Sequence, residues 1–366
     1  MAGAKAPLPG PGILDIAPYV GGESKAMGIE QPIRLASNES ALGPSPKAIA
    51  AYRALAGEIH RYPDGGAEQL REALGRVHGL DPARIVCGAG SDELIGLLLR
   101  SYAGPGDEVL YSRHGFLMYP IGAKSVGATP VAVPERDLTA DVEAILAHVT
   151  ERTRLVIVAN PNNPTGTYLG MAALDRLHAG LPPDVVLAID AAYSEFVNRN
   201  DFEPGVRLVE RGDNVVMLRT FSKIYALAAL RLGWAYCPPG IADVLNRVRG
   251  PFNVSAPALA AGVAALEDAD ALAHARAHND RWLPWLSQRL AALGLPLTPS
   301  VANFVLPRFP DDPRHNADAA FAFLQSRGIL TRKMHAYGLP QYLRISIGTG
   351  EEMETVAAAL ADFMRA

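Results

Sequence analysis

Lys223 stands in the stretch "RTFSKIYALAALRLG" at the end of an apolar, strand-like run, with Ser222 beside it and Arg231 eight residues later. A lysine that closes a strand is most often a solvated surface charge. The sharper hypothesis is an amine that forms an imine with a carbonyl cofactor. Ser222 and Arg231 would then bind the phosphate of that cofactor, the arginine through its planar fork of donors.

A second strand-like run, "RIVC", is followed by "GAGSDELIG". Gly90 permits a tight turn, and Ser91 and Asp92 open a helix whose free N–H groups can bind a phosphate. The third glycine of a dinucleotide-binding fingerprint is missing, since Glu93 occupies its place. Taken alone, this stretch is explained better by a capped helix than by a phosphate site.

Two further strand-like runs end in residues that could face a ligand. "NPNNPTG" holds two prolines and three asparagines, Asn163 among them, which indicates a rigid loop that presents amide side chains. In "DAAYSEF", Asp190 leaves an apolar strand, where a carboxylate is costly unless it meets a cation. A protonated pyridine nitrogen would be that cation, and Tyr193 could reach the ring's phenolic oxygen. A helix cap is the alternative for Asp190.

These four sites must be brought together by a fold. From about residue 44 to 240, short apolar runs alternate with helical patterns, which predicts an α/β domain with a mostly parallel sheet covered by helices. Ligands of such sheets bind at the carboxyl ends of the strands, so we expect the residues that follow these four strands to lie close together. We expect an N-terminal arm (1–43) that partly completes the small domain, a large cofactor-binding domain (44–245) and a smaller α+β domain (246–366). The expected strands of the large domain are "RIVCGAG", "EVLYS", "ATPVAVP", "RLVIVAN", "VVLAID", "NVVMLRTF" and "LGWAYCP".

The composition excludes several classes of function. The chain has 366 residues, 49% apolar and 20% charged, and its net charge of -4 gives no reason to expect nucleic acid or an anionic membrane as a partner. The N-terminus has no sustained apolar core, so it is not a secretory signal, and no apolar run approaches the roughly 20 residues of a membrane helix. Cys87 and Cys237 lie in apolar, strand-like surroundings, which suits buried thiols in a reducing compartment. A cytoplasmic protein is expected. His60 and His114 lack metal-ligand spacing, so no metal is expected.

In order along the chain, a phosphate-binding helix, an asparagine loop, an aspartate and a lysine with an arginine are what pyridoxal 5'-phosphate requires. The sequence also resembles the aspartate-aminotransferase superfamily of pyridoxal-phosphate enzymes and, within it, the histidinol-phosphate aminotransferases. The resemblance covers nearly the whole chain. Its motifs are "PYVGGES", "LASNESALGPSP", "HRYPDGG", "GAGSDELI", "HGFLMYP", "NPNNPTGT", "DAAYSEF", "RTFSKIYALAALRLG", "GILTRKM" and "LRISIGT".

The resemblance implies a role for each cofactor-binding residue. Lys223 is implied as the lysine that bonds to the cofactor and as the catalytic base and acid, and Asp190 as the partner of the ring nitrogen. Asn163 and Tyr193 are implied on the phenolic oxygen, and Phe116 against the ring, where the family usually has tyrosine. The implied phosphate ligands are Gly90, Ser91, Asp92, Ser222 and Arg231, with Tyr62 reaching the phosphate from the partner subunit of a homodimer.

The resemblance also implies substrate residues. Arg344 matches the arginine that binds the α-carboxylate of an amino acid such as glutamate, while Arg332, Tyr19 and Asn38 match positions at the phosphate-bearing end of the substrate. Without the resemblance, both arginines would be interpreted as surface charges on an edge strand. One departure is Ala191, where the family usually has glutamate, and it bears on local packing.

The activity implied is transamination between L-histidinol phosphate with 2-oxoglutarate and imidazole-acetol phosphate with L-glutamate, in histidine biosynthesis. Aromatic amino acid aminotransferases and threonine-phosphate decarboxylases have similar motifs and remain alternatives. A binding or regulatory protein that keeps the fold without catalysis is a third, because fold alone does not imply activity. The intact lysine argues against that third possibility.

Overall fold

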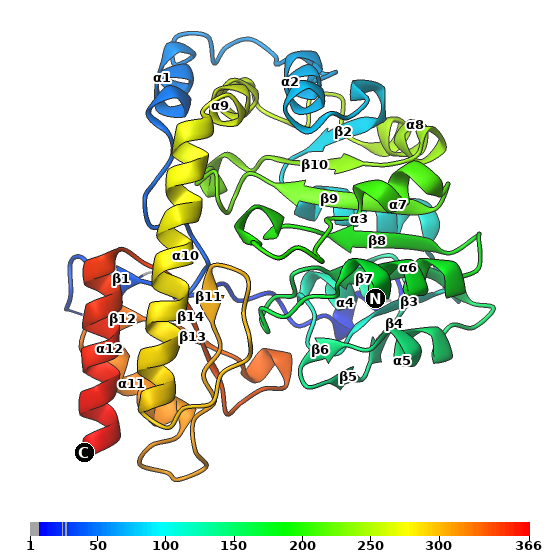
Figure 1. Ribbon diagram of the computed structural model, residues 1–366. Coiled ribbons are helices and arrows are strands. Elements are labelled where there is room, and N and C mark those ends of the chain that lie inside the picture. The colour runs from blue at the N-terminus through cyan, green and yellow to red at the C-terminus, as the bar shows by residue number, and fades with distance from the viewer. Residues whose placement is uncertain (1–6, 24, 26–27) are drawn as a thin grey trace, which may run out of the picture.

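The computed structural model describes residues 7–23, 25 and 28–366. Its central element is a seven-stranded sheet in the order β2-β10-β9-β8-β7-β3-β4, in which only β10 runs antiparallel to its neighbours. All seven strands lie within the segments expected from the sequence or overlap them, so the predicted mostly parallel α/β sheet is confirmed (Figure 1). Their bounds are β2 (Ile85–Gly88), β3 (Glu108–Ser112), β4 (Thr129–Val133), β7 (Thr153–Ala159), β8 (Val186–Asp190), β9 (Val215–Thr220) and β10 (Gly233–Tyr236).

The central strands are apolar throughout because both faces of the sheet are covered. Along β7, Val156 and Val158 belong to one core cluster, whereas Leu155 and Ile157 belong to the other. Helices α3, α4 and α8 contribute to the second cluster, and α2, α5, α6, α7 and α9 to the first. Their bounds are α2 (Glu68–His78), α3 (Ser91–Tyr102), α4 (Met118–Ser125), α5 (Val142–Ala147), α6 (Met171–Gly180), α7 (Val206–Arg211), α8 (Pro239–Val248) and α9 (Ala256–Leu266).

A separate, smaller layer is built by the C-terminal part of the chain. The antiparallel order β11-β14-β13 forms one sheet, and β1 pairs in parallel with β12, which brings the N-terminal segment into this layer. Helices α10, α11 and α12 lie along it (Figure 1). The bounds are β1 (Ile33–Arg34), α10 (Ala269–Ala292), β11 (Phe304–Val305), α11 (Ala317–Ser326), β12 (Ile329–Leu330), β13 (Arg332–Lys333), β14 (Leu343–Ser346) and α12 (Gly350–Arg365).

The remaining elements are short connections and the helix α1, which packs on α9. A two-stranded hairpin, β5–β6, follows β4, and single turns of 3₁₀ helix lie between the larger elements. Their bounds are η1 (Ile13–Asp15), α1 (Pro46–Ala54), η2 (Pro82–Arg84), β5 (Glu135–Arg136), β6 (Thr139–Ala140), η3 (Ser194–Phe196), η4 (Ala228–Leu230) and η5 (His335–Tyr337). None of the helices in the described part of the chain combines the length and apolar composition needed to cross a membrane.

The proposed domain boundaries at residues 43 and 245 remain a prediction. Ala258 and Ala261 of α9 pack in the core of the seven-stranded sheet, whereas Leu286 and Leu290 of α10 pack in the C-terminal core. Helix α10 therefore connects the two cores, beginning beside α9 and ending in the smaller layer (Figure 1). Residues 1–6, 24 and 26–27 of the predicted arm lie outside the described residues.

Candidate active site

A cavity of about 350 Å³ lies where β7, β8 and β9 end and α3 begins. The convergence predicted from the strand exits is therefore present, because segments far apart in the sequence line a single hollow. The residues of the predicted site that line it are Tyr19, Ser91, Asp92, Phe116, Asn163, Asp190, Tyr193, Ser222, Lys223 and Arg231.

One end of this cavity is built to receive an anion. Arg231 Nη1 lies 3.4 Å from the Ser222 hydroxyl, beside the N-terminus of α3, where Ser91 is the first residue. Gly90, the residue before this helix, has a φ of 85°, and a Cβ at this position would lie 2.5 Å from Arg231 Nη2. The glycine is therefore required for both its backbone conformation and the close approach of the guanidinium. A guanidinium, a hydroxyl and helix N–H groups together suit a phosphate.

The cavity wall also includes Asp190, the last residue of β8. This residue is 6% exposed; its Oδ2 accepts a hydrogen bond of 2.7 Å from the Tyr119 hydroxyl, while its buried Oδ1 has no partner among the described residues. Burial raises the pKa of Asp190, and the hydrogen bond from Tyr119 opposes that shift. An unpartnered buried carboxylate oxygen calls for a cationic donor, and a protonated pyridine nitrogen is one.

Lys223 lines the same cavity. Its Nζ donates to the Ser37 carbonyl oxygen at 3.2 Å and lies 5.7 Å from the centre of the Tyr193 ring. Burial, and then the positive charge of Arg344, lower the pKa of the Lys223 amine to about 8. A larger fraction of this amine is consequently neutral near physiological pH than for an ordinary lysine, as a nucleophile or general base requires.

Asn163 and Tyr193 accept hydrogen bonds from residues of the N-terminal segment and of β14. The Tyr193 hydroxyl accepts a 2.9 Å hydrogen bond from Asn38 Nδ2, and Asn163 Oδ1 accepts one from Arg344 Nη1. Arg344 also donates to the Ala36 carbonyl at 2.7 Å. Asn38 and Arg344 thus contact the cofactor-site residues directly, and both are buried.

A neighbouring cavity of about 950 Å³ shares Tyr19 with the first one and is lined by Arg332, whereas Asn38 and Arg344 line neither cavity. Arg332 lies over the Tyr19 ring, 5.9 Å from its centre, and donates to the Val20 carbonyl at 2.5 Å. Tyr19 in turn meets Phe116 edge to face, with ring centres 6.3 Å apart. The N-terminal segment therefore forms one wall of the site.

Tyr62 is a predicted cofactor residue that the chain does not bring to its own cavity. Its side chain is 82% exposed and stacks on Phe252, with ring centres 4.6 Å apart. Its predicted contact with the phosphate of a partner subunit's cofactor stays a prediction.

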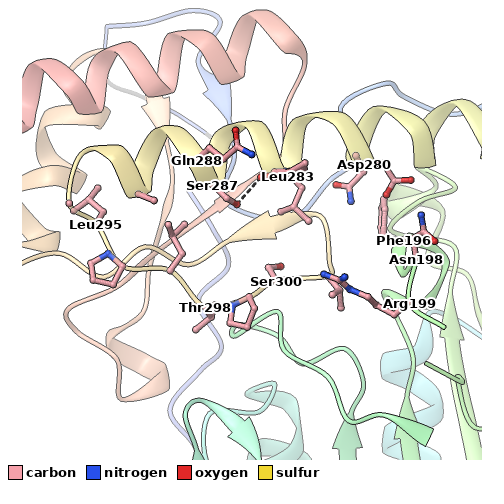
Figure 2. Close-up of a pocket in the computed structure, with 18 residues that line it drawn as sticks. Phe196, Asn198, Arg199, Asp280, Leu283, Ser287, Gln288, Leu295, Thr298 and Ser300 are labelled. Carbon is pink, nitrogen blue, oxygen red and sulfur yellow. Dashed lines mark hydrogen bonds between the residues drawn. The ribbon is translucent and has the colours of Figure 1, made fainter. Parts of the chain in front are cut away.

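The two cavities described above are lined by predicted site residues. A third cavity, of about 920 Å³, is not. It lies between α10, the segment 294–301 and residues after β8, and its wall includes Phe196, Arg199 and Asp280 (Figure 2). None of the predicted cofactor or substrate residues lines it. The volume of a cavity therefore does not identify the active site in this protein.

Sequence reasoning missed Tyr119 and the Ser37 carbonyl. Tyr119 lies in the quoted "HGFLMYP", three residues after Phe116, but nothing local indicates that it bonds to a carboxylate 71 residues later. Ala191, the departure from the family pattern, is fully buried, and its backbone N–H donates to the Leu218 carbonyl at 2.9 Å. His114 makes a 2.6 Å contact from Nδ1 to the Tyr337 carbonyl, as a structural histidine would.

The sequence model of the family described as aminotransferase class I and II matches residues 30–360. This chain belongs to that family. It is 63% identical, over 99% of both chains, to the histidinol-phosphate aminotransferase of Paramagnetospirillum magneticum (strain ATCC 700264 / AMB-1). The crystal structure of histidinol-phosphate aminotransferase from Sinorhizobium meliloti in complex with pyridoxal-5'-phosphate matches with a TM-score of 0.87, 31% identity and 96% coverage of each chain.

A more distant match establishes the fold alone. A mutant of the aspartate aminotransferase of Thermus thermophilus superposes with a TM-score of 0.79 at 21% identity, covering 92% of this chain and 97% of the other. The predicted aspartate-aminotransferase-like fold is thus confirmed, as is the prediction of a pyridoxal-phosphate-dependent aminotransferase. The residues present fit this cofactor, since Asp190 Oδ1 lacks a partner among the described residues and Gly90 leaves room beside Arg231.

Proposed function

We propose that this aminotransferase interconverts L-histidinol phosphate and 2-oxoglutarate with imidazole-acetol phosphate and L-glutamate, as a step of histidine biosynthesis. The names of relatives that are 52–63% identical support this substrate pair. The structural observation that carries it is the pair of arginines, Arg332 and Arg344, on adjacent strands: Arg344 bonds to Asn163 of the site, and Arg332 lines the cavity that shares Tyr19 with it. Both substrates are anionic, one through a phosphate and the other through two carboxylates, and guanidinium groups bind both kinds of group.

Pyridoxal 5'-phosphate, when bound, supplies an aldehyde for the substrate's amino group and a ring that delocalises the electrons left when the Cα–H proton is removed. The phosphate would be held by Ser91, Ser222 and Arg231 at the N-terminus of α3. Asp190 Oδ1 would pair with the ring nitrogen and keep it protonated. These residues would hold the cofactor through its phosphate and its ring nitrogen.

Lys223 performs the proton transfers in this proposal. Its Nζ would take the proton from the substrate's Cα and later give a proton back, so that one group would serve as base and then as acid. The lowered pKa, about 8, suits both directions of transfer near neutral pH. Asn163 and Tyr193 would orient the ring through its phenolic oxygen, and Arg344, bonded to Asn163, would bind the glutamate α-carboxylate. Asn38, Tyr19 and Arg332 would line the phosphate end of the substrate.

A panel of half-reactions tests the substrate assignment. Histidinol phosphate, phenylalanine, tyrosine, aspartate and threonine phosphate are each added to the purified holoenzyme, and the change in cofactor absorbance is followed while carbon dioxide is measured. The expected result is a much higher kcat/KM for histidinol phosphate and no carbon dioxide. A preference for phenylalanine or tyrosine would instead indicate an aromatic aminotransferase, and carbon dioxide release from threonine phosphate a decarboxylase.

The proposal includes a cytoplasmic homodimer with shared active sites. Tyr62 is exposed and remote from its own cavity, and several large apolar side chains of the same stretch are exposed too, namely Leu42, Ile49, Tyr52 and Ile59. Apolar side chains gathered in this way are typical of an interface. A two-fold axis would let each Tyr62 reach the other subunit's phosphate site. Cys87 and Cys237 are free and buried, which suits a reducing compartment.

A further inference from the structure

Asp190 has a second neighbour that no motif singled out. The Tyr119 hydroxyl, on the first turn of α4, donates to Asp190 Oδ2 at 2.7 Å, and the two residues are 1% and 6% exposed. The other oxygen of Asp190 has no partner among the described residues. The carboxylate is thus occupied on one side by a protein donor and left open on the side assigned to the cofactor's ring nitrogen.

The charge of Asp190 depends on such donors. A buried carboxylate becomes neutral unless hydrogen bonds or cations stabilise the anion. Burial raises the pKa of Asp190 and Asp92 adds to the rise, whereas the Tyr119 hydrogen bond, the backbone N–H of Ala192 and the charge of Lys223 oppose it, with Tyr119 first among them. Burial and the neighbouring Asp190 also raise the pKa of Tyr119 well above its ordinary value, so the phenol stays protonated and remains a donor.

The direction of the Tyr119 hydroxyl is fixed by packing. Its ring meets Phe116 edge to face, with centres 5.9 Å apart and an interplanar angle of 89°, and meets Tyr111 at 6.5 Å and 69°. Phe116 is the residue predicted to lie against the cofactor ring. One short segment, 116–119, therefore supplies both a face for the ring and a donor for the aspartate opposite its nitrogen.

We propose that Tyr119 is a positioning residue that keeps Asp190 ionised and aimed at the ring nitrogen of pyridoxal 5'-phosphate. Without the hydroxyl, the proton shared between Asp190 and the nitrogen shifts toward the carboxylate, and the ring loses its positive charge. The inference rests on the assignment of Asp190 to the ring nitrogen. It is independent of which amino donor the enzyme prefers, so its test uses no substrate.

The test compares two ligands on the apoenzyme. Dissociation constants are measured for pyridoxal 5'-phosphate and for an analogue in which the ring nitrogen is replaced by C–H, with wild type and Tyr119→Phe. Loss of one charge-assisted donor predicts a roughly tenfold weaker binding of the natural cofactor. The carbon analogue cannot pair with Asp190, so its dissociation constant should change by less than about twofold.

Two further variants separate positioning from packing. Tyr111→Phe removes a hydroxyl with no hydrogen bond in the described structure from the ring that neighbours Tyr119, and should leave both constants unchanged. When Asp190→Asn is already present, adding Tyr119→Phe should cost less than about twofold, because the two residues act through one contact.

Three results would overturn the proposal: equal weakening of both ligands, no change for either ligand, or a full loss of about tenfold when Tyr119→Phe is added to Asp190→Asn. The assignment on which the proposal rests is tested separately. If Asp190→Asn itself failed to weaken the natural cofactor relative to the carbon analogue, the placing of Asp190 opposite the ring nitrogen would be wrong.

Discussion

Arg332 and Arg344 are direct cross-strand partners: they occupy opposed positions of the antiparallel pair β13–β14. Opposed residues of such a pair project from the same face of the sheet, with Cβ atoms about 4.5–5.5 Å apart. Two like charges so placed repel each other. Arg344 is relieved by contacts to Asn163 and Ala36, and Arg332 by the Val20 carbonyl and the Tyr19 ring. An anionic substrate would relieve both, which is why this pair carries the proposed specificity.

Arg332→Ala should reduce kcat/KM for histidinol phosphate far more than for glutamate. A phosphate dianion that loses a charge-assisted partner loses about 1.5–3 kcal/mol, or roughly 10- to 100-fold. Arg327→Ala is the control, because Arg327 is a half-exposed arginine of the same layer that pairs with Asp362 and lines neither cavity. Steady-state kinetics with both substrates check this, and equal losses for the two would show that Arg332 does not discriminate between them.

Lys223→Ala should remain folded and still bind the cofactor noncovalently, but lose nearly all turnover. Among the described residues that line the cavity, Lys223 carries the one side-chain amine that can form the bond to the cofactor's carbonyl carbon. Borohydride reduction followed by mass spectrometry measures that bond. A reduced adduct at the wild-type level in the variant would show that another amine carries it.

The rate at which the apoenzyme forms this bond should rise with pH to a midpoint near 8. The pKa of Lys223 is lowered from 10.5 to about 8 by burial and by Arg344, so the amine is protonated and unreactive below that pH and neutral above it. The rate of adduct formation is measured between about pH 6 and 10 at constant ionic strength, with Lys223→Ala as the background. A midpoint that stays near 10.5 would contradict the role given to burial.

Gly90→Ala should weaken cofactor binding strongly. The position has a φ of 85°, and the added Cβ would lie 2.5 Å from Arg231 Nη2, so the guanidinium must move out of the phosphate site. Gly96→Ala, within α3 with nothing near the added Cβ, is the control and should bind normally. Titration of the apoenzyme with pyridoxal 5'-phosphate gives both dissociation constants, and similar values for the two variants would remove Arg231 from the site.

Mixing two inactive variants tests the shared site. Lys223→Ala and Tyr62→Ala chains are denatured together and refolded, and activity is compared with each parent refolded alone. If Tyr62 serves the partner subunit, every mixed dimer contains one site with both residues intact, and activity should rise well above either parent. If it serves its own subunit, every site stays defective, and mixing restores nothing.

The sequence by itself determined where the strands end and which reactive residues follow them. Gly90, Asn163, Asp190 and Lys223 each end or follow an apolar run, and the periodicity of such runs is a local property of the chain. The parallel order of the sheet then follows from general rules of chain connection, so the convergence of these residues was predictable. Their types and order were sufficient to predict the cofactor.

Only the tertiary structure decided which other side chains form hydrogen bonds with the residues of the site. The contacts of Tyr119 with Asp190, of Asn38 with Tyr193 and of Arg344 with Asn163 join segments 71, 155 and 181 residues apart. No local pattern encodes such pairs, because each depends on how a helix or a second sheet is placed against the strand ends. The same holds for the lowered pKa of Lys223, which arises from burial and from a charge on β14, and for the exposure of Tyr62.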